Sequence, residues 1–324
     1  MDKIVTFEEE KRKEFLYVLF NAVFVTTCVV FILNFFFGFI CSNIYAGDSL
    51  FKDSADNILR SFFSAVAISA AFVFYGVHSD VSLKSVFTPK KTSVLWFVAG
   101  AVTAAGISFF FALISEKAVG LLGNFGYIMN EYTPYILENP AENIANMIVV
   151  CLFSAFSSEL VFRGILTERF RRANTGVALI LPAMIAASMT GSLAKMPYVF
   201  FLSIFLSWIY MKSSSVYATL FCAFITDVSL YLFHIYRSAL APYEPLFVFG
   251  GLVAAAAFGA LLIIKFGIRT VYPAPRDDDD EYLRISAKES VLGILKAFSF
   301  WIFVLAVIFT VLFFYLSNPT VEMP

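Results

Sequence analysis

Apolar segments long enough to cross a membrane recur along the whole chain and restrict what it can fold into. About 20 helical residues span the hydrocarbon core of a bilayer, where the backbone must satisfy its own hydrogen bonds. On this criterion we predict about nine membrane-crossing helices, at residues 15–41, 58–78, 93–115, 143–166, 177–194, 197–211, 215–236, 245–268 and 293–317. The fifth and sixth are short and contain Pro182 and Pro197, so a count of eight is also compatible with the sequence.

Composition supports the same interpretation. Of the 324 residues, 60% are apolar and only 15% are charged, which is more apolar surface than a water-soluble fold can bury. The formal net charge of -1 provides no basic face for nucleic acid. We therefore predict an all-α, polytopic transmembrane helical bundle whose partners are the lipid bilayer and other membrane proteins or peptides, with no nucleic-acid partner.

Positive charges are distributed unequally between the alternating loops, which predicts the orientation of the chain. Sixteen Lys and Arg residues fall in one set of loops and five in or beside the other. Because cytoplasmic loops carry the excess of basic residues, the first set is predicted to be cytoplasmic. It contains the N-terminal arm and residues 79–92, 167–176, 212 and 265–288. We thus expect a multi-pass protein of a bacterial cell membrane with a cytoplasmic N-terminus.

The fourth predicted helix contains two charges in an otherwise apolar run. Its segment Ser157–Leu166 reads Ser-Ser-Glu-Leu-Val-Phe-Arg-Gly-Ile-Leu, with the charges at Glu159 and Arg163. Charged groups inside a membrane are costly and usually face the bundle interior with a partner. An acid four residues before a base shares its helix face in the favourable order, so we predict an ion pair between these two side chains.

This segment resembles the signature of the CAAX-protease and bacteriocin-processing family of intramembrane metalloproteases, which includes the type II CAAX prenyl proteases. The family signature reads roughly Glu-Glu-x-x-Phe-Arg-Gly, and it matches here at Glu159, Phe162, Arg163 and Gly164. The resemblance implies a core of four helices with this motif in the first. Four predicted helices follow in that order from residue 143 to 236, and the resemblance extends over roughly 90–240.

The resemblance implies metal-assisted hydrolysis. A glutamate activates water, histidines on two later helices bind the metal or position the water, and an asparagine or aspartate one turn after the second histidine stabilises the oxyanion. Three departures affect this chain, because Ser158, Lys195 and Ala223 stand where the first glutamate and the two histidines are expected. The motif positions that remain, as a vestigial site, are Glu159, Arg163 and Asp227.

Three functions are compatible with these residues. The first is a catalytically degenerate pseudoprotease without a cofactor or metal, which acts as a membrane binding or regulatory module. The second is an active metal-dependent endopeptidase with a rearranged site, in which Glu159 is the base and Asp227 and His234 bind zinc or a similar ion. The third is a small transporter component in which Glu159, Arg163, Lys195 and Asp227 line a polar path.

The buried charges also permit a structural ion-pair network without any ligand. Because Lys195 and Asp227 would each leave a net charge in the bundle, we predict that these two residues pair with each other. The chain then divides as follows: a cytoplasmic arm at 1–14, N-terminal transmembrane helices with an outer loop at 15–142, the CAAX-protease-like four-helix core at 143–240, and C-terminal transmembrane helices at 241–324, including a cytoplasmic acidic loop at 269–288.

Overall fold

The fold is built from helices, and no strand occurs among the residues that the structure describes. The structure is a computed structural model that describes residues 2–44, 52–78, 83–88, 92–123, 140–190, 195–236, 241–267 and 287–316. Its elements are α1 (Asp2–Ile44), α2 (Lys52–His78), α3 (Leu83–Phe87), α4 (Val94–Gly123), α5 (Pro140–Glu159), the π-helix η1 (Leu160–Thr167), α6 (Glu168–Ala173), α7 (Thr175–Met189), α8 (Met196–Ser213), α9 (Val216–Ile235), the 3-10 turn η2 (Ala241–Tyr243), α11 (Glu244–Phe266), α12 (Ala287–Lys296) and α13 (Phe298–Leu316).

The predicted helical membrane bundle is confirmed. Within the described residues the predicted apolar segments lie on helices, except that the last one is divided between α12 and α13. Within the described residues, six helices are long and apolar enough to cross a membrane, and α12 with α13 makes a seventh if this bent pair is one span. Two further apolar stretches, Ser61–Val77 in α2 and Thr175–Met189 in α7, are shorter. The protein is therefore an integral, multi-pass membrane protein.

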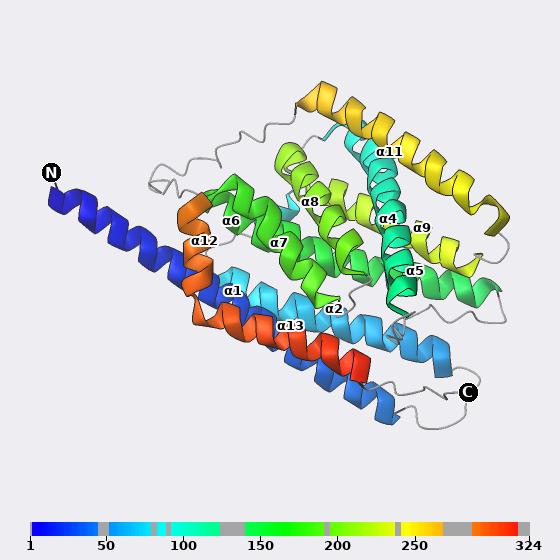
Figure 1. Cartoon of the computed structure of the whole chain (residues 1–324), viewed down its shortest axis with the longest axis horizontal. Helices are drawn as coiled ribbons and strands as arrows, with labels where there is room; N and C mark the ends of the chain where they lie inside the picture. Colours follow the sequence, from blue (N-terminus) through cyan, green and yellow to red (C-terminus); the bar gives the residue numbers. More distant parts are fainter. Residues whose placement is uncertain are drawn as a thin grey trace.

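Four consecutive helical segments enclose the region that carries the motif. The continuous helix formed by α5, η1 and α6 packs against α7 and α9, while α8 packs between α7 and α9 and completes the ring. On one side α1, α2 and α13 cover this ring, and α4 and α11 lie on another side (Figure 1). The motif is thus held in the interior of the bundle.

Local signals in the sequence explain where the helices around the motif begin and end. The Asn174 side chain accepts hydrogen bonds from the backbone N–H groups of Gly176 (2.8 Å) and Val177 (3.2 Å) and so caps the start of α7. Ser214 adopts a left-handed conformation (φ 51°) that ends α8, and Val216 begins α9 only two residues later. This short turn makes α8 and α9 antiparallel neighbours.

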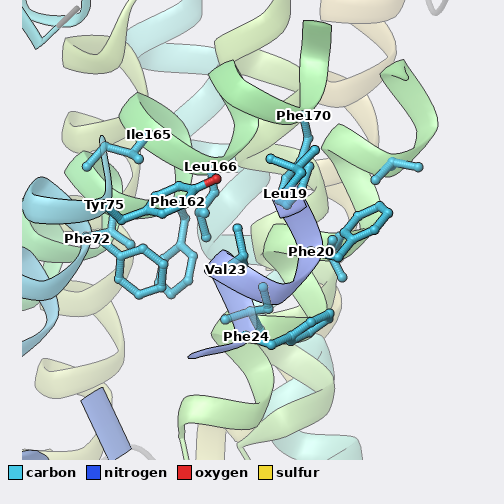
Figure 2. Packing of buried hydrophobic residues seen from close by; sticks show 14 of the residues in the cluster. Leu19, Phe20, Val23, Phe24, Phe72, Tyr75, Phe162, Ile165, Leu166 and Phe170 are labelled. Carbon is cyan, nitrogen blue, oxygen red and sulfur yellow. The ribbon is translucent and has the colours of Figure 1, made fainter. Parts of the chain in front are cut away.

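Aromatic packing holds the outer helices on the motif helix. Phe20 and Phe24 of α1, Phe72 of α2 and Phe162 of η1 belong to one buried cluster, which Figure 2 shows from close by. Phe20 stacks on Phe170 at a ring-centroid distance of 6.0 Å. Phe162 of the motif is therefore a core residue that joins η1 to α1 and α2.

The last predicted span needs a correction. We predicted one helix over 293–317, but the structure ends α12 at Lys296, begins α13 at Phe298 and bends the two by 72°. The physical reason is charge, because Lys288, Glu289 and Lys296 give α12 a polar side that a membrane-crossing helix does not tolerate.

Much of the predicted outer loop (116–142) and of the acidic loop (269–288) lies outside the described residues, so the orientation remains a prediction.

Candidate functional site

The motif helix changes to π-helical geometry where its charged residues lie. All eight residues of η1 (Leu160–Thr167) are buried. The Thr167 hydroxyl donates to the carbonyl of Phe162 at 2.6 Å, five residues earlier, which matches the wider i→i+5 repeat of a π-helix. π-Helical segments are rare in proteins, and those that occur are often found at functional sites. The π-helical geometry therefore indicates the same residues as the sequence motif does.

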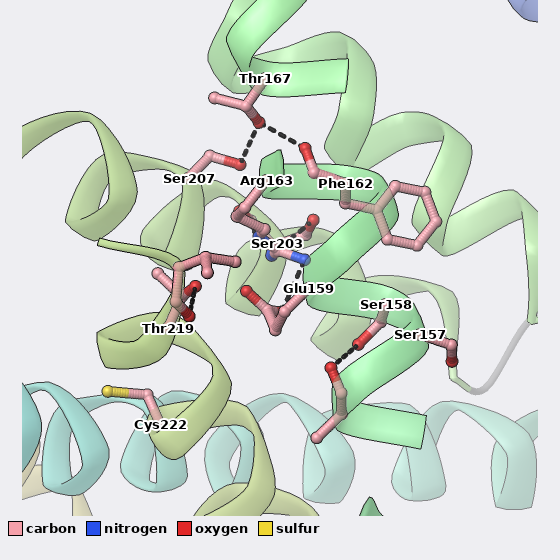
Figure 3. Close-up of polar contacts among 12 residues, drawn as sticks. Ser157, Ser158, Glu159, Phe162, Arg163, Thr167, Ser203, Ser207, Thr219 and Cys222 are labelled. Atoms are coloured by element: carbon pink, nitrogen blue, oxygen red, sulfur yellow. Dashed lines mark hydrogen bonds and ion pairs between the residues drawn. The ribbon is translucent and has the colours of Figure 1, made fainter. Parts of the chain in front are cut away.

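The ion pair that we predicted from the four-residue spacing is confirmed. Arg163 Nη1 lies 2.9 Å from Glu159 Oε1, and the two side chains are only 3% and 1% exposed. Arg163 Nη2 donates to both the carbonyl (3.1 Å) and the hydroxyl (3.0 Å) of Ser203 on α8. Figure 3 shows this network, in which Arg163 links the motif helix to α8 through charge-assisted hydrogen bonds.

Part of this polar network has no hydrogen-bond partner. The second carboxylate oxygen of Glu159 (Oε2) and the Nε of Arg163 are both buried and unpaired. Thr219 of α9 lies near the Glu159 carboxylate, but its hydroxyl donates to the carbonyl of Val216 at 3.0 Å. The carboxylate is thus held on one oxygen by Arg163, while its other oxygen faces the α9 side of the site.

Asp227 lies on α9 and belongs to the same polar region. Its carboxyl group interacts with the Ser154 hydroxyl on α5 and is close enough to Glu159 for the two carboxyl groups to act on each other. From the sequence we placed Asp227 in a pair with Lys195 and at a different depth from Glu159. The structure places Asp227 beside Ser154, five residues or about 8 Å before Glu159 along the motif helix, because α5 and α9 pack directly against each other.

The Lys195–Asp227 pair was a wrong prediction. The groups that interact with the Asp227 carboxyl are Ser154 and Glu159, and Lys195 is not among them. Lys195 precedes α8, which runs antiparallel to α9 and is joined to it by a turn at Ser214. Counting 1.5 Å per residue from that turn, Lys195 lies roughly 10 Å farther along the bundle than Asp227. A lysine side chain does not close that gap.

The other departures from the family pattern occupy ordinary packing positions. Ser158 is half-buried, and its hydroxyl donates to the carbonyl of Ala155 in its own helix at 3.2 Å. Ala223 is buried and belongs to an apolar cluster that α4, α8, α9 and α11 form. Lys195, at the position of the first histidine, directly precedes α8, whereas the side chains of His78 and His234 lie outside the described residues.

Sequence reasoning missed the neutral polar residues that surround the charges. Ser203 and Ser207 on α8 and Thr219 and Cys222 on α9 are all buried. The Ser207 and Thr167 hydroxyls hydrogen-bond at 3.3 Å. This contact joins the same two helices as the Ser203–Arg163 contact, four residues further along each. Their signal in the sequence was a pair of serines four residues apart in an apolar helix, which places both hydroxyls on one face.

The donor set does not fit a catalytic metal. Among the described residues, no group of three or more His, Cys, Asp and Glu side chains is arranged to hold a metal ion. The guanidinium of Arg163 already neutralises Glu159 at 2.9 Å, and its positive charge would repel a cation beside that carboxylate.

Comparison with known proteins agrees with the motif. Residues 140–229 match the family model described as type II CAAX prenyl endopeptidase Rce1-like. No curated protein and no solved structure matches the chain. The matched residues run from the start of α5 to the second half of α9 and contain Glu159, Arg163 and Asp227. Residues 140–229 of this multi-pass membrane protein are therefore similar to the type II CAAX prenyl endopeptidases.

Proposed function

We propose that this protein is a catalytically degenerate member of the CAAX-protease-like membrane proteins and acts as a binding or regulatory module. The observation that supports this most strongly is the burial and ion pairing of Glu159, the glutamate that remains from the signature. Glu159 is 1% exposed and is paired with Arg163 at 2.9 Å. A general base must accept a proton from water, and a carboxylate that is buried and neutralised by a guanidinium is poorly suited to that task.

The residues at the missing positions support the same proposal. Ser158 hydrogen-bonds its own helix, and Ala223 packs in an apolar cluster. Neither supplies a carboxylate or an imidazole, the groups that activate water or bind a hydrolytic metal. Retention of the four-helix ring suits a protein that binds another membrane protein or a membrane-embedded peptide.

The alternative is an active endopeptidase with a rearranged site, and one observation favours it. The Asp227 carboxyl group is within electrostatic range of Glu159, so the same polar region contains two carboxyl groups. The second proposed ligand, His234, is seven residues after Asp227 on the continuous helix α9. Seven residues correspond to about 10 Å along a helix, which is too far for both side chains to bind one ion without a break in α9. We therefore favour the pseudoprotease.

Metal analysis of the protein purified from native membranes, together with identification of co-purified proteins, tests this proposal. We expect no stoichiometric zinc or similar ion, no cleavage of a prenylated CAAX peptide, and a specific co-purified partner. One tightly bound equivalent of metal that is lost in Asp227→Ala, or peptide cleavage that is lost in Glu159→Gln, would overturn it. Ser108→Ala is the matched control, because Ser108 is buried on α4 and belongs to no motif position.

A further inference from the structure

The helix α12 (Ala287–Lys296) has two different exposed faces. Its inner face consists of the buried Ser290, the half-buried Gly293 and Ile294, and Ala297, the buried residue that follows α12. A side chain added at Gly293 would contact Phe20 at 3.1 Å and Leu16 at 3.4 Å, so this face lies closely against α1. The rest of the helix surface is exposed, although half of it is apolar.

The exposed surface of α12 is divided lengthwise. Val291 and Leu295 are 53% and 46% exposed and form an apolar edge, whereas Glu289 and Lys296 are exposed at the opposite edge. The exposed Lys288 and Leu292 lie between the two edges. At about 100° per residue, the two edges are separated by more than a quarter turn around the helix. Such an arrangement is typical of a helix at the membrane–water boundary, where one side contacts acyl chains and the other contacts headgroups and water.

The depth of α12 agrees with that boundary. The apolar span of α1 begins at Lys13, and Gly293 contacts α1 at Leu16 and Phe20. These residues are three and seven positions inside the span, or about 5 to 10 Å at 1.5 Å per residue. Interfacial helices bury their apolar face about 5–10 Å into the region between headgroups and acyl chains.

The direction of α12 agrees as well. It is bent by 72° from α13, and α13 runs along the membrane-spanning part of α1, where Phe303 contacts Phe24 and Phe31. A helix at that angle to a spanning helix lies close to the membrane plane. The Trp301 indole N–H donates to the carbonyl of Leu295 at 3.0 Å and braces the bend. Figure 1 shows α12 turned across α13.

We infer that α12 is an in-plane helix at the bilayer surface, with Val291 and Leu295 among acyl chains and Glu289 and Lys296 at the phospholipid headgroups. The apolar edge continues into the lipid-facing surface of α13, where Phe298 and Trp301 are 71% and 51% exposed. Aromatic side chains of this kind are enriched at the membrane–water boundary. The partner of this face is therefore lipid, which also surrounds α13, and not a protein.

The test uses spin labels on the full-length protein in phosphatidylcholine vesicles. In a background with the four native cysteines replaced by alanine, Leu295→Cys and Lys296→Cys each carry a nitroxide. Collisions with oxygen, which is concentrated in lipid, and with a water-soluble nickel chelate are then measured. We expect the oxygen-to-nickel ratio to be several-fold higher at position 295 than at 296, and highest at a Leu305→Cys control in the middle of α13.

Two results would overturn the inference. Equal ratios at 295 and 296 would mean that α12 is not at a boundary. Shielding of the apolar edge from both reagents would mean that a second copy or another protein covers it. Val291→Cys and Glu289→Cys form a second pair on the same two edges and must give the same order. All four positions are exposed, so the labels do not perturb the packing against α1.

Discussion

Replacing Arg163 with methionine should destabilise the protein strongly. The change removes the 2.9 Å ion pair to Glu159 and the two hydrogen bonds to Ser203, and it strands a carboxylate that is 1% exposed. Loss of one partner of a buried pair typically costs about 3 to 5 kcal/mol. We expect Glu159→Leu to have a cost of the same order because it strands the guanidinium. In the double variant both charges are gone, so most of the loss should be recovered.

The assay measures the free energy of unfolding in detergent micelles for the unaltered protein, the two single variants and the double variant. The difference between the double-variant loss and the sum of the single losses is the coupling energy. We expect a coupling energy of at least about 2 kcal/mol between the two positions. Arg171→Met is the matched control, because Arg171 pairs with Glu168 at 2.7 Å and the two side chains are 6% and 14% exposed. This pair is less buried than Glu159 and Arg163, so we expect its loss to have a smaller cost. Additive single effects, or a loss in Arg163→Met no larger than in the control, would refute the reasoning.

Two further predictions concern glycines at close helix contacts. A Cβ at Gly106 would lie 2.4 Å from the Cβ of Ala255, so Gly106→Ala should separate α4 from α11 and cost about 1–3 kcal/mol in unfolding free energy. Gly250→Ala meets nothing within 4 Å and should be neutral or slightly stabilising. A Cβ at Gly164 would lie 2.8 Å from Val86 Cγ1, so Gly164→Ala should lower the melting temperature, and Val86→Ala in the same chain should restore it. Failure of the rescue would show that α3 is not the obstructing element.

Local pattern was sufficient to predict the helices and the ion pair. Apolar length determines where a helix crosses lipid, and a four-residue separation places Glu159 and Arg163 on one face whatever surrounds them. Both features depend only on residues that are neighbours in sequence. The bend between α12 and α13 was missed because a count of apolar residues gives no weight to the charged edge of α12.

Contacts between helices were predicted less well. The depth of Asp227 relative to Glu159 depends on how α5 crosses α9, and the partner of Arg163 depends on which face of α8 is turned inward. The spacing of residues within one helix predicts neither of these contacts. The Lys195–Asp227 prediction failed for this reason, since charge balance indicates that each buried charge needs a partner but does not identify the partner.

The residues that this chain retains from the signature are those that hold helices together. Arg163 links η1 to Ser203 of α8, and Phe162 lies in the core between η1 and the outer helices. Gly164 leaves room for Val86 of α3 at a distance that no side chain would permit. A bundle can lose its reactive groups and stay folded, but it cannot lose the buried contacts that position its helices. The part of the signature that this chain retains therefore includes residues that position its helices.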